Sequence, residues 1–467
     1  MNTRLLFILA LTFSIGIQSC KKDSFISSPD ARLSLSADSI KFDTVFASAG
    51  SVSKVFKIVN NNNQKLLISS VKLKGGAASA FKTNINGTAA TEVNNIELAA
   101  NDSMYVFVTV FVNPNANNLP FILSDSISIN YNGNTRFVQL QAYGQNAVFL
   151  SNTTITSNTT WTNNLPYIIL GGIRISSTAT LTMQPGCKIY AHANAAFLVD
   201  GTLIANGTIG NKIIFNGDRL DEPYKNFPAS WPGIYFRDSS RNSLLTFAEI
   251  RNAYQAVVVI NPSQNTSPKL VIKQSIIDNA YSTGLLAIST RLIAENCLIS
   301  NCSNNIVLQG GGDYNLTHCT SASYSTRYLI HKQPVLVVSD VVMVNGVLQT
   351  SNLNAVFRNS IFWGDNGSVD NEIAVAKQGT GTFTVSFDHC MYKAANPIPF
   401  STLIADIKNQ DPKFDSIDIN NNIYNFRVTK NALAPGINKG IATTLLKDLD
   451  NNNRSVGLPD IGCYEKQ

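Results

Sequence analysis

Polar positions along this chain are filled by Asn, Ser and Thr more than by Glu and Lys, and apolar residues gather in short stretches between them. Asn, Ser and Thr side chains compete with the helical backbone for hydrogen bonds, whereas β-branched and aromatic residues favour strands. Beyond residue 17 we find no stretch in which apolar residues recur with helical spacing. The pattern therefore predicts an all-β protein.

The segment 31–146 alternates apolar and polar residues at the spacing of a β-sandwich. Within Val55–Val59, neighbouring side chains are expected on opposite faces of a half-buried strand. The segments Asn60–Gln64 and Asn132–Asn134 are expected turns, because Asn and Gly accept left-handed backbone angles. The expected strands include Ser39–Phe46, Val52–Asn60, Lys65–Leu73, Ser103–Val112, Ser124–Tyr131 and Thr135–Tyr143.

From about residue 147 the chain repeats itself. Ile250–Tyr254, Ile277–Tyr281 and Ile299–Ser303 align with offsets of 27 and 22 residues, and Cys297 and Cys319 are again 22 apart. A step near 22 is typical of one coil of a parallel β-helix with three short strands, and insertions at the corners explain longer steps. Each coil buries its inward residues only when another coil stacks on it.

The alternation within each repeat predicts which side chains point into this shared core. The candidates are Ile234 and Phe236, Val257 and Val259, Leu270 and Ile272, Leu285 and Ala287, Ile306 and Leu308, and Val335 and Val337. Asn252, Asn279 and Asn301 are expected to stack as a ladder at a tight bend, where their amides bond along the stack.

Three segments of the first part resemble an immunoglobulin-like module of the abnormal-spindle type found in bacterial surface proteins. These are Phe42–Val45, Phe56–Asn60 and Gln141–Gly144. The resemblance implies a spacer or adhesive module, and no catalytic constellation is visible in it.

The second part resembles right-handed parallel β-helix proteins of the pectate-lyase-like superfamily, in their bacterial lipoprotein branch. The segments that carry this resemblance are Thr180–Tyr190, Val199–Thr208, Ile213–Phe215, Trp231–Phe236, Asp448–Arg454 and Pro459–Glu465. It covers about two thirds of the chain and is specific for fold far more than for activity. The expected fold class is all-β, with an N-terminal immunoglobulin-like β-sandwich followed by a right-handed parallel β-helix solenoid over 147–467.

The first 30 residues read as a signal and a tether. Met1–Arg4 carries positive charge, and the apolar run Leu5–Ile17 is shorter than the roughly 20 residues that span a bilayer. The run ends at Cys20, and the start Cys20–Asp23 resembles lipoproteins of the Bacteroidetes type. This implies a signal peptide over 1–19, lipidation of Cys20, a tether over 20–30 and an outer-membrane location facing either the periplasm or the medium.

Charge narrows the possible partners. The 467 residues carry a formal net charge of +6, and 14% of them are charged, against about 25% in an average soluble protein. The Lys and Arg residues form no long basic run, so a nucleic-acid partner is not expected. The expected partners are the membrane, through the lipid, and a polysaccharide or a surface protein.

The sequence offers little support for a catalytic site or a metal site. Between residues 240 and 345 no acid recurs at one-coil spacing with another acid, as a calcium-dependent lyase or a two-carboxylate hydrolase would require; the acids there are Glu249, Asp278, Glu295, Asp313 and Asp340. The pairs His318–Cys319 and His389–Cys390 suggest buried thiols with outward histidines better than a zinc site, because adjacent strand residues face opposite ways. We expect no metal and no cofactor.

The best candidate surface is the insertion Asn216–Ser230, because long corner insertions of a solenoid gather on one face. Candidate glycan-binding residues are Asp218, Asp221, Glu222, Tyr224 and Trp231. Aromatic rings stack on sugar faces while acids and amides bond hydroxyls. The alternative is a loop that folds back over the coils, with Trp231 as a core residue.

The sequence thus favours a lipid-anchored envelope protein that binds glycans or proteins without catalysis. A polysaccharide lyase or glycoside hydrolase, and a purely structural stalk, remain the alternatives.

The anchor is tested by replacing Cys20 with Ala. We expect the variant to leave the membrane fraction, because no attached lipid would hold it to the bilayer. Cell fractionation with immunodetection measures this, and Lys21→Ala is the matched control that keeps the cysteine. Unchanged membrane association of Cys20→Ala would contradict the anchor.

Overall fold

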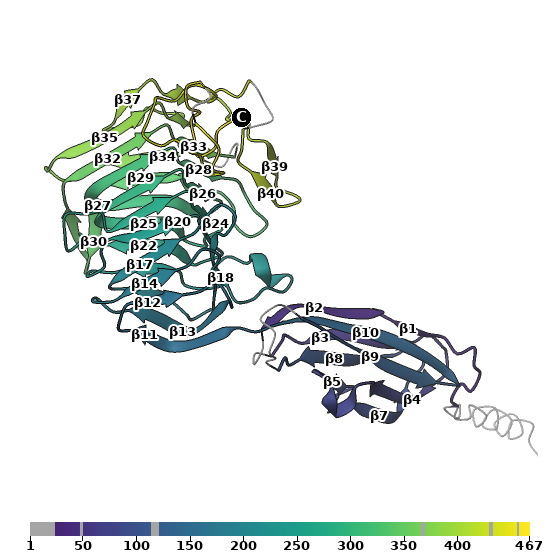
Figure 1. Ribbon diagram of the computed structural model, residues 1–467. Coiled ribbons are helices and arrows are strands. Elements are labelled where there is room, and N and C mark those ends of the chain that lie inside the picture. The colour runs from purple at the N-terminus through teal and green to yellow at the C-terminus, as the bar shows by residue number, and fades with distance from the viewer. Residues whose placement is uncertain (1–23, 47–49, 114–120, 366–368, 429–432, 455–456) are drawn as a thin grey trace, which may run out of the picture. The chain divides into compact units, whose positions relative to one another are not determined.

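The computed structural model describes residues 24–46, 50–113, 121–365, 369–428, 433–454 and 457–467. Residues 1–23, with the expected signal and Cys20, lie outside this range. The chain divides into two compact units, 1–146 and 147–467 (Figure 1). Within the described residues, helix is limited to two single 3-10 turns, η1 (Gly76–Ala78) and η2 (Tyr224–Asn226), and no helix is long and apolar enough to cross a bilayer.

The first unit is a β-sandwich of two five-stranded sheets around one apolar core. One sheet has the order β1 (Leu33–Leu35), β3 (Lys54–Asn60), β8 (Ser103–Val110), β5 (Phe81–Ile85) and β6 (Thr88–Ala89). The other has the order β2 (Ser39–Phe46), β10 (Asn134–Gln145), β9 (Phe121–Tyr131), β4 (Leu66–Leu73) and β7 (Glu92–Leu98). The predicted alternation is confirmed: Phe56 and Ile58 are buried, whereas Val55 is 46% exposed.

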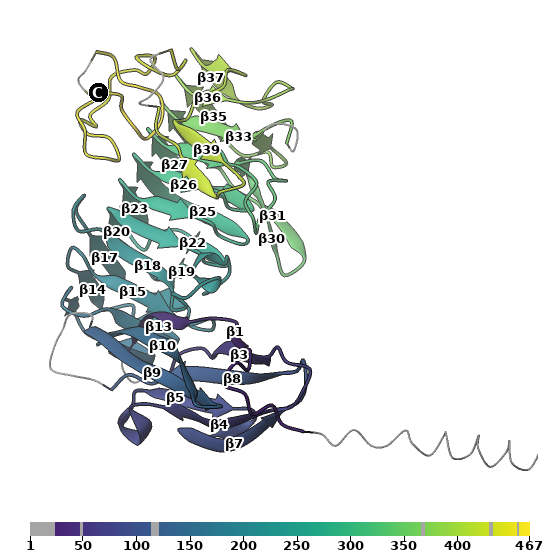
Figure 2. The same cartoon turned by 90° about the vertical axis from the view of Figure 1, so that its right-hand side faces the viewer.

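The second unit is a parallel β-helix whose 26 strands pair in parallel from coil to coil (Figures 1 and 2). Its strands line three faces, and the longer strands β13, β25 and β27 each bend across two of them. The first face comprises β11 (Val148–Ile155), β13 (Tyr167–Ile175), β16 (Phe197–Val199), β19 (Ile234–Phe236), β22 (Gln255–Ile260), β25 (Thr283–Glu295), β27 (Asn304–Thr317), β29 (Leu336–Ser339) and β34 (Ile373–Ala376).

The second face adds β12 (Thr159–Trp161), β14 (Thr180–Met183), β17 (Thr202–Asn206), β20 (Ser243–Thr246), β23 (Leu270–Lys273), β32 (Leu353–Arg358), β35 (Phe383–Asp388) and β37 (Thr402–Ile404). The third face comprises β15 (Lys188–Ala191), β18 (Ile213–Gly217), β21 (Ala248–Arg251), β24 (Ile276–Asp278), β26 (Leu298–Ser300), β28 (Thr320–Ser323), β33 (Ile361–Gly364), β36 (Met391–Tyr392) and β38 (Ile407–Lys408). Two antiparallel hairpins stand apart from these faces: β30 (Val341–Val344) with β31 (Val347–Thr350), and β39 (Ser416–Asp418) with β40 (Ile423–Asn425). The predicted all-β class, a sandwich followed by a parallel β-helix, is confirmed.

The core of the β-helix is one continuous apolar cluster from Ile155 to Ile398. The register gives the predicted 22-residue step, with Ile277 opposite Ile299, and all the expected inward residues are buried except Val337. Val335 is buried in the core just before β29, but within the strand the inward residues are Leu336 and Val338, and Val337 faces outward. The prediction for Val337 was wrong, because the insertion before β29 hides where the strand begins, and a one-residue slip exchanges the two faces.

The asparagine ladder lies at the corner between the third face and the first. Asn252, Asn279 and Asn301 all have positive φ, and Asn279 Nδ2 donates to Asn252 Oδ1 over 2.7 Å. Asn252 Nδ2 in turn donates to Asn216 Oδ1 over 2.9 Å, so the ladder extends one coil further than predicted. Asn301 departs from it and donates to Asp278 Oδ1 over 3.4 Å.

A second column of positive-φ residues lies between the second face and the third; its members are Phe247, Gln274, Asn296, His318, Asn359 and His389. The C-terminal segment, residues 433–454 and 457–467, covers this column. Its Arg454 donates to Asn296 Oδ1 over 2.8 Å. His318 is therefore fully buried, and burial, with the charge of Arg454, lowers the pKa of its imidazole well below the usual value. The expectation of an outward His318 is wrong, because the residue occupies a turn beneath the C-terminal segment instead of alternating along a strand.

The cysteines are core residues. All six in the described residues are buried free thiols, namely Cys187, Cys297, Cys302, Cys319, Cys390 and Cys463. Burial raises the pKa of Cys319 well above its usual value, and Cys297 lies against it. The buried cysteines pack as small apolar groups.

The shared core is tested by Leu285→Ala. Leu285 is fully buried, so we expect a loss of about 2–5 kcal/mol in the free energy of unfolding. Its neighbour Leu286 lies only partly buried on the outer side of the same strand, and Leu286→Ala should cost clearly less. Urea unfolding measures both, and equal losses would contradict the assigned register.

Candidate functional site

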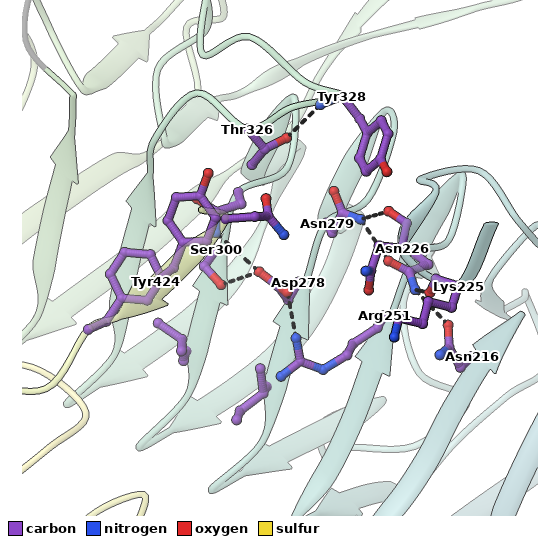
Figure 3. Close-up of a pocket in the computed structure, with 16 residues that line it drawn as sticks. Asn216, Lys225, Asn226, Arg251, Asp278, Asn279, Ser300, Thr326, Tyr328 and Tyr424 are labelled. Atoms are coloured by element: carbon purple, nitrogen blue, oxygen red, sulfur yellow. Dashed lines mark hydrogen bonds and ion pairs between the residues drawn. The ribbon is translucent and has the colours of Figure 1, made fainter. Parts of the chain in front are cut away.

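A cavity of about 400 Å³ lies over the third face of the β-helix, where β21, β24 and β26 run side by side (Figure 3). Three other segments of the same unit complete it: the insertion 216–230, the segment 324–334 and the chain around β40. The cavity therefore combines a regular floor with walls that come from far apart in the sequence.

The floor centres on the Asp278 carboxylate. Because the strands pair in register, Arg251, Asp278 and Ser300 occupy equivalent positions in successive coils. Asp278 accepts hydrogen bonds from Arg251 Nη1 over 2.6 Å and from Ser300 Oγ over 2.7 Å. Stacking thus holds a guanidinium, a carboxylate and a hydroxyl in one row (Figure 3).

The asparagine ladder fastens the insertion to this floor. Asn252 Nδ2 donates to the Lys225 carbonyl and Asn279 Nδ2 to the Asn226 carbonyl, each over 2.9 Å. These two bonds place Lys225 and Asn226, both residues of η2, at the rim of the cavity (Figure 3). The ladder amides are used in these bonds, so they are structural groups that position the wall.

Aromatic rings form the opposite walls. The Tyr328 ring packs edge-on against Phe227 at 4.9 Å between centroids, which joins the segment 324–334 to the insertion. Tyr424 and Phe426 come from the C-terminal part of the chain, and the Tyr424 hydroxyl donates to the Ser325 carbonyl over 3.1 Å. No hydrogen bond of the Tyr328 hydroxyl occurs among the described residues, which leaves it open to a ligand.

Buried polar contacts anchor the segment 324–334. His331 and Glu372 are both fully buried, with His331 Nε2 lying 3.0 Å from Glu372 Oε1. The amide of Ser325 donates to the Asp365 carboxylate over 2.8 Å. Residues of the connection between β33 and β34, which is the corresponding corner of the next coil, therefore fix the segment that carries Tyr328.

Two titratable groups of the cavity, Arg251 and Tyr424, have raised pKa values. Burial opposes the charge on Arg251, but Asp278 and Glu249 outweigh it and raise the pKa of the guanidinium. Burial raises the pKa of the Tyr424 hydroxyl to about 12, and nearby Asp278 adds to this. At neutral pH the floor thus carries a fixed ion pair, and Tyr424 remains a neutral donor.

The acids predicted as glycan ligands are bound to neighbouring bases instead of lining the cavity. Asp218 lies 2.7 Å from His192 Nδ1, and Asp221 accepts two hydrogen bonds from Arg219. Glu222 pairs with Lys225 within the insertion. All three acids are thus engaged by basic side chains of the protein, two of them within the insertion.

The two aromatic candidates for glycan binding, Tyr224 and Trp231, differ in their burial. Tyr224 is 41% exposed and lies under the Arg219 guanidinium at 3.9 Å. Trp231 is only 1% exposed, and its Nε1 donates to the Arg251 carbonyl over 2.8 Å. Trp231 is a core residue, as in the alternative interpretation, because the corner before β19 turns its ring inward.

Sequence reasoning did not single out Tyr328, Tyr424 or Phe426. Asp278 had a usable signal: it directly precedes the ladder residue Asn279, so it had to end a strand of the third face. The aromatic residues had none, since their place depends on where an insertion and the C-terminal part fold back.

In the described residues, no group of three or more His, Cys, Asp and Glu side chains is arranged to hold an ion.

Comparison with known proteins assigns no family. No family model matches the chain, and no curated protein is similar to it. The catalytic unit of the GH87 α-1,3-glucanase of Streptomyces thermodiastaticus matches 76% of this chain and 88% of its own, with 10% identity and a TM-score of 0.28. A protein of unknown function from Porphyromonas gingivalis matches 26% of this chain and 51% of its own, with 12% identity and a TM-score of 0.19. Likenesses at these TM-scores carry no inference about function.

The floor of the cavity is tested by Asp278→Ala. We expect the free energy of unfolding to fall by about 2 kcal/mol, because Arg251 and Ser300 lose a charged hydrogen-bond partner. Asp313→Ala is the matched control: its pair with Arg291 is about half exposed on both sides, and its loss should cost below about 1 kcal/mol. Urea unfolding measures both, and an equal cost would show that the row at Asp278 is an ordinary surface pair.

Proposed function

We propose that this protein binds a neutral glycan in the cavity over the third face and does not turn it over. The observation that carries the proposal is the lining itself. Its charged side chains are already paired within the protein, and the rest of the lining is made of amides, hydroxyls and aromatic rings together with the aliphatic side chains of Ile276 and Leu298.

The pairing of charges favours a neutral ligand. An anionic or cationic ligand would have to displace Asp278 from Arg251 or Glu222 from Lys225, and the ligand would gain little over the pair it replaced. A sugar instead offers hydroxyls to groups such as the Tyr328 hydroxyl, and its apolar ring face packs on an aromatic ring.

Binding without turnover is favoured by the carboxylate count. Asp278 is the single carboxylate among the described residues that line the cavity, and three side chains already bind it. Glycoside hydrolysis ordinarily uses two carboxylates about 5–10 Å apart. A calcium-assisted lyase would need six to eight oxygen ligands for the ion.

The cellular setting of the proposal rests on the N-terminal sequence. The basic start, the short apolar run and Cys20 support attachment to the cell envelope through lipid. A lipid-anchored chain would present the cavity to glycans at that surface.

The proposal is tested by isothermal titration of the chain with cellohexaose, laminarihexaose, xylohexaose and mannohexaose. We expect one of these neutral hexasaccharides to bind and Tyr328→Ala to weaken that binding about tenfold, because the ring and its hydroxyl are both lost. Tyr328→Phe keeps the ring and should weaken binding about threefold.

Tyr254→Ala is the matched control, since Tyr254 is 47% exposed and lies outside the cavity lining. Absence of binding to all four hexasaccharides would overturn the proposal. Release of shorter sugars during incubation would replace binding by hydrolysis or lysis.

A further inference from the structure

The hairpin formed by β30 and β31 is the most exposed apolar element of the β-helix unit. Its strands pair antiparallel around the turn Asn345–Gly346, where both residues have positive φ. Such a two-residue turn fits the twist of the strands it joins, which makes the hairpin a defined element.

The end of this hairpin is apolar on both of its faces. Met343 is opposite Leu348 on one face, and Val344 is opposite Val347 on the other. These side chains are 59%, 56%, 37% and 61% exposed, in that order. The ten residues from Val341 to Thr350 include no charged side chain.

The other insertions of the unit behave differently. The insertion 216–230 and the segment 324–334 fold down against the coils, where Phe227 and Tyr328 pack on each other. Near its base the hairpin is held against the coils, where Val342 lies against Gly310 of β27. Figure 2 shows β30 and β31 projecting beside the stacked strands. An exposed apolar tip of this kind marks contact with an apolar environment outside the unit, either a protein surface or a lipid surface.

The composition of the tip distinguishes between two such environments. Protein interfaces concentrate their binding energy in Trp, Tyr and Arg, whereas Leu and Val are under-represented among hot spots. The tip has Met, Val and Leu and lacks aromatic residues, Arg and other charged groups. It offers undirected apolar area on two faces, which suits a fluid apolar medium better than a shaped protein surface.

We infer that the tip Met343–Leu348 inserts shallowly into a lipid surface. Only shallow insertion fits, because the turn and the outer edges of a two-stranded ribbon keep polar backbone groups that need water or headgroups. A few partly buried apolar side chains bind weakly alone and become effective beside a second membrane signal. The inference does not depend on glycan binding.

The test is flotation of the chain from Lys21 on, which keeps every described residue and carries no lipid, with phosphatidylcholine vesicles. A parallel experiment uses vesicles of equal parts phosphatidylcholine and phosphatidylglycerol. We expect weak but measurable binding to both, and on the phosphatidylcholine vesicles it should be insensitive to added salt because the tip is uncharged. Met343→Ser with Leu348→Ser, and separately Val344→Ser with Val347→Ser, should each lower the partition coefficient about tenfold.

The matched control is Leu446→Ser with Leu458→Ser, which removes two leucines of comparable exposure, 71% and 56%, from the C-terminal segment. This control should bind like the parent chain. A Val347→Trp reporter should shift its emission to shorter wavelengths when vesicles are added. Absence of flotation, equal binding by the hairpin variants, or binding only to anionic vesicles would overturn the inference, as would hairpin-dependent dimerisation without flotation.

Discussion

Parallel pairing of one coil with the next is the constraint on which the β-helix unit depends. A single coil leaves its inward side chains half covered, and only the coils above and below complete their burial. Ile250, Ile277 and Ile299 show this directly, since each lies in register with the next and all are buried. Because pairing fixes the strands so tightly, the corners are free to carry insertions, and the distinctive chemistry of the unit gathers there.

The same register also creates the polar floor of the cavity. Residues that follow the strands of the third face are forced into columns, so an asparagine at one corner meets an asparagine of the next coil. The ladder saturates backbone carbonyls of the insertion as well as its own amides. The ladder thereby positions Lys225 and Asn226 at the rim of the cavity. The amide nitrogens of Asn252 and Asn279 are used in these bonds, so neither is free to bind a ligand.

The sequence predicted what depends on local repetition and missed what depends on distant contacts. The 22-residue step, the inward pairs from Ile234 to Leu308 and the ladder at Asn252 and Asn279 all follow from the pattern within a coil. Val337 was placed on the wrong side because the residues before β29 interrupt that pattern. His318 was expected outside because nothing near it in sequence announces that Arg454 and its neighbours cover it.

The candidate site contains both local and distant contacts that the sequence did not reveal. Acids of the insertion looked available in the sequence, yet Asp221 and Glu222 pair with Arg219 and Lys225 of the same insertion, and Asp218 lies against His192 of an earlier coil. The wall residue Tyr424 lies more than a hundred residues from Asp278, and no local signal links the two.

The three insertions of the unit illustrate how burial decides the role of a loop. The rings of Phe227 and Tyr328 pack on each other and form a wall, so their two segments become part of the cavity. Met343 and Leu348 pair across the hairpin and remain more than half exposed, so their segment remains a surface. Since all three leave the same rigid stack, the difference lies in the residues of each insertion and not in the scaffold. A solenoid of this kind therefore separates stability, which the inward columns supply, from recognition, which each insertion sets independently.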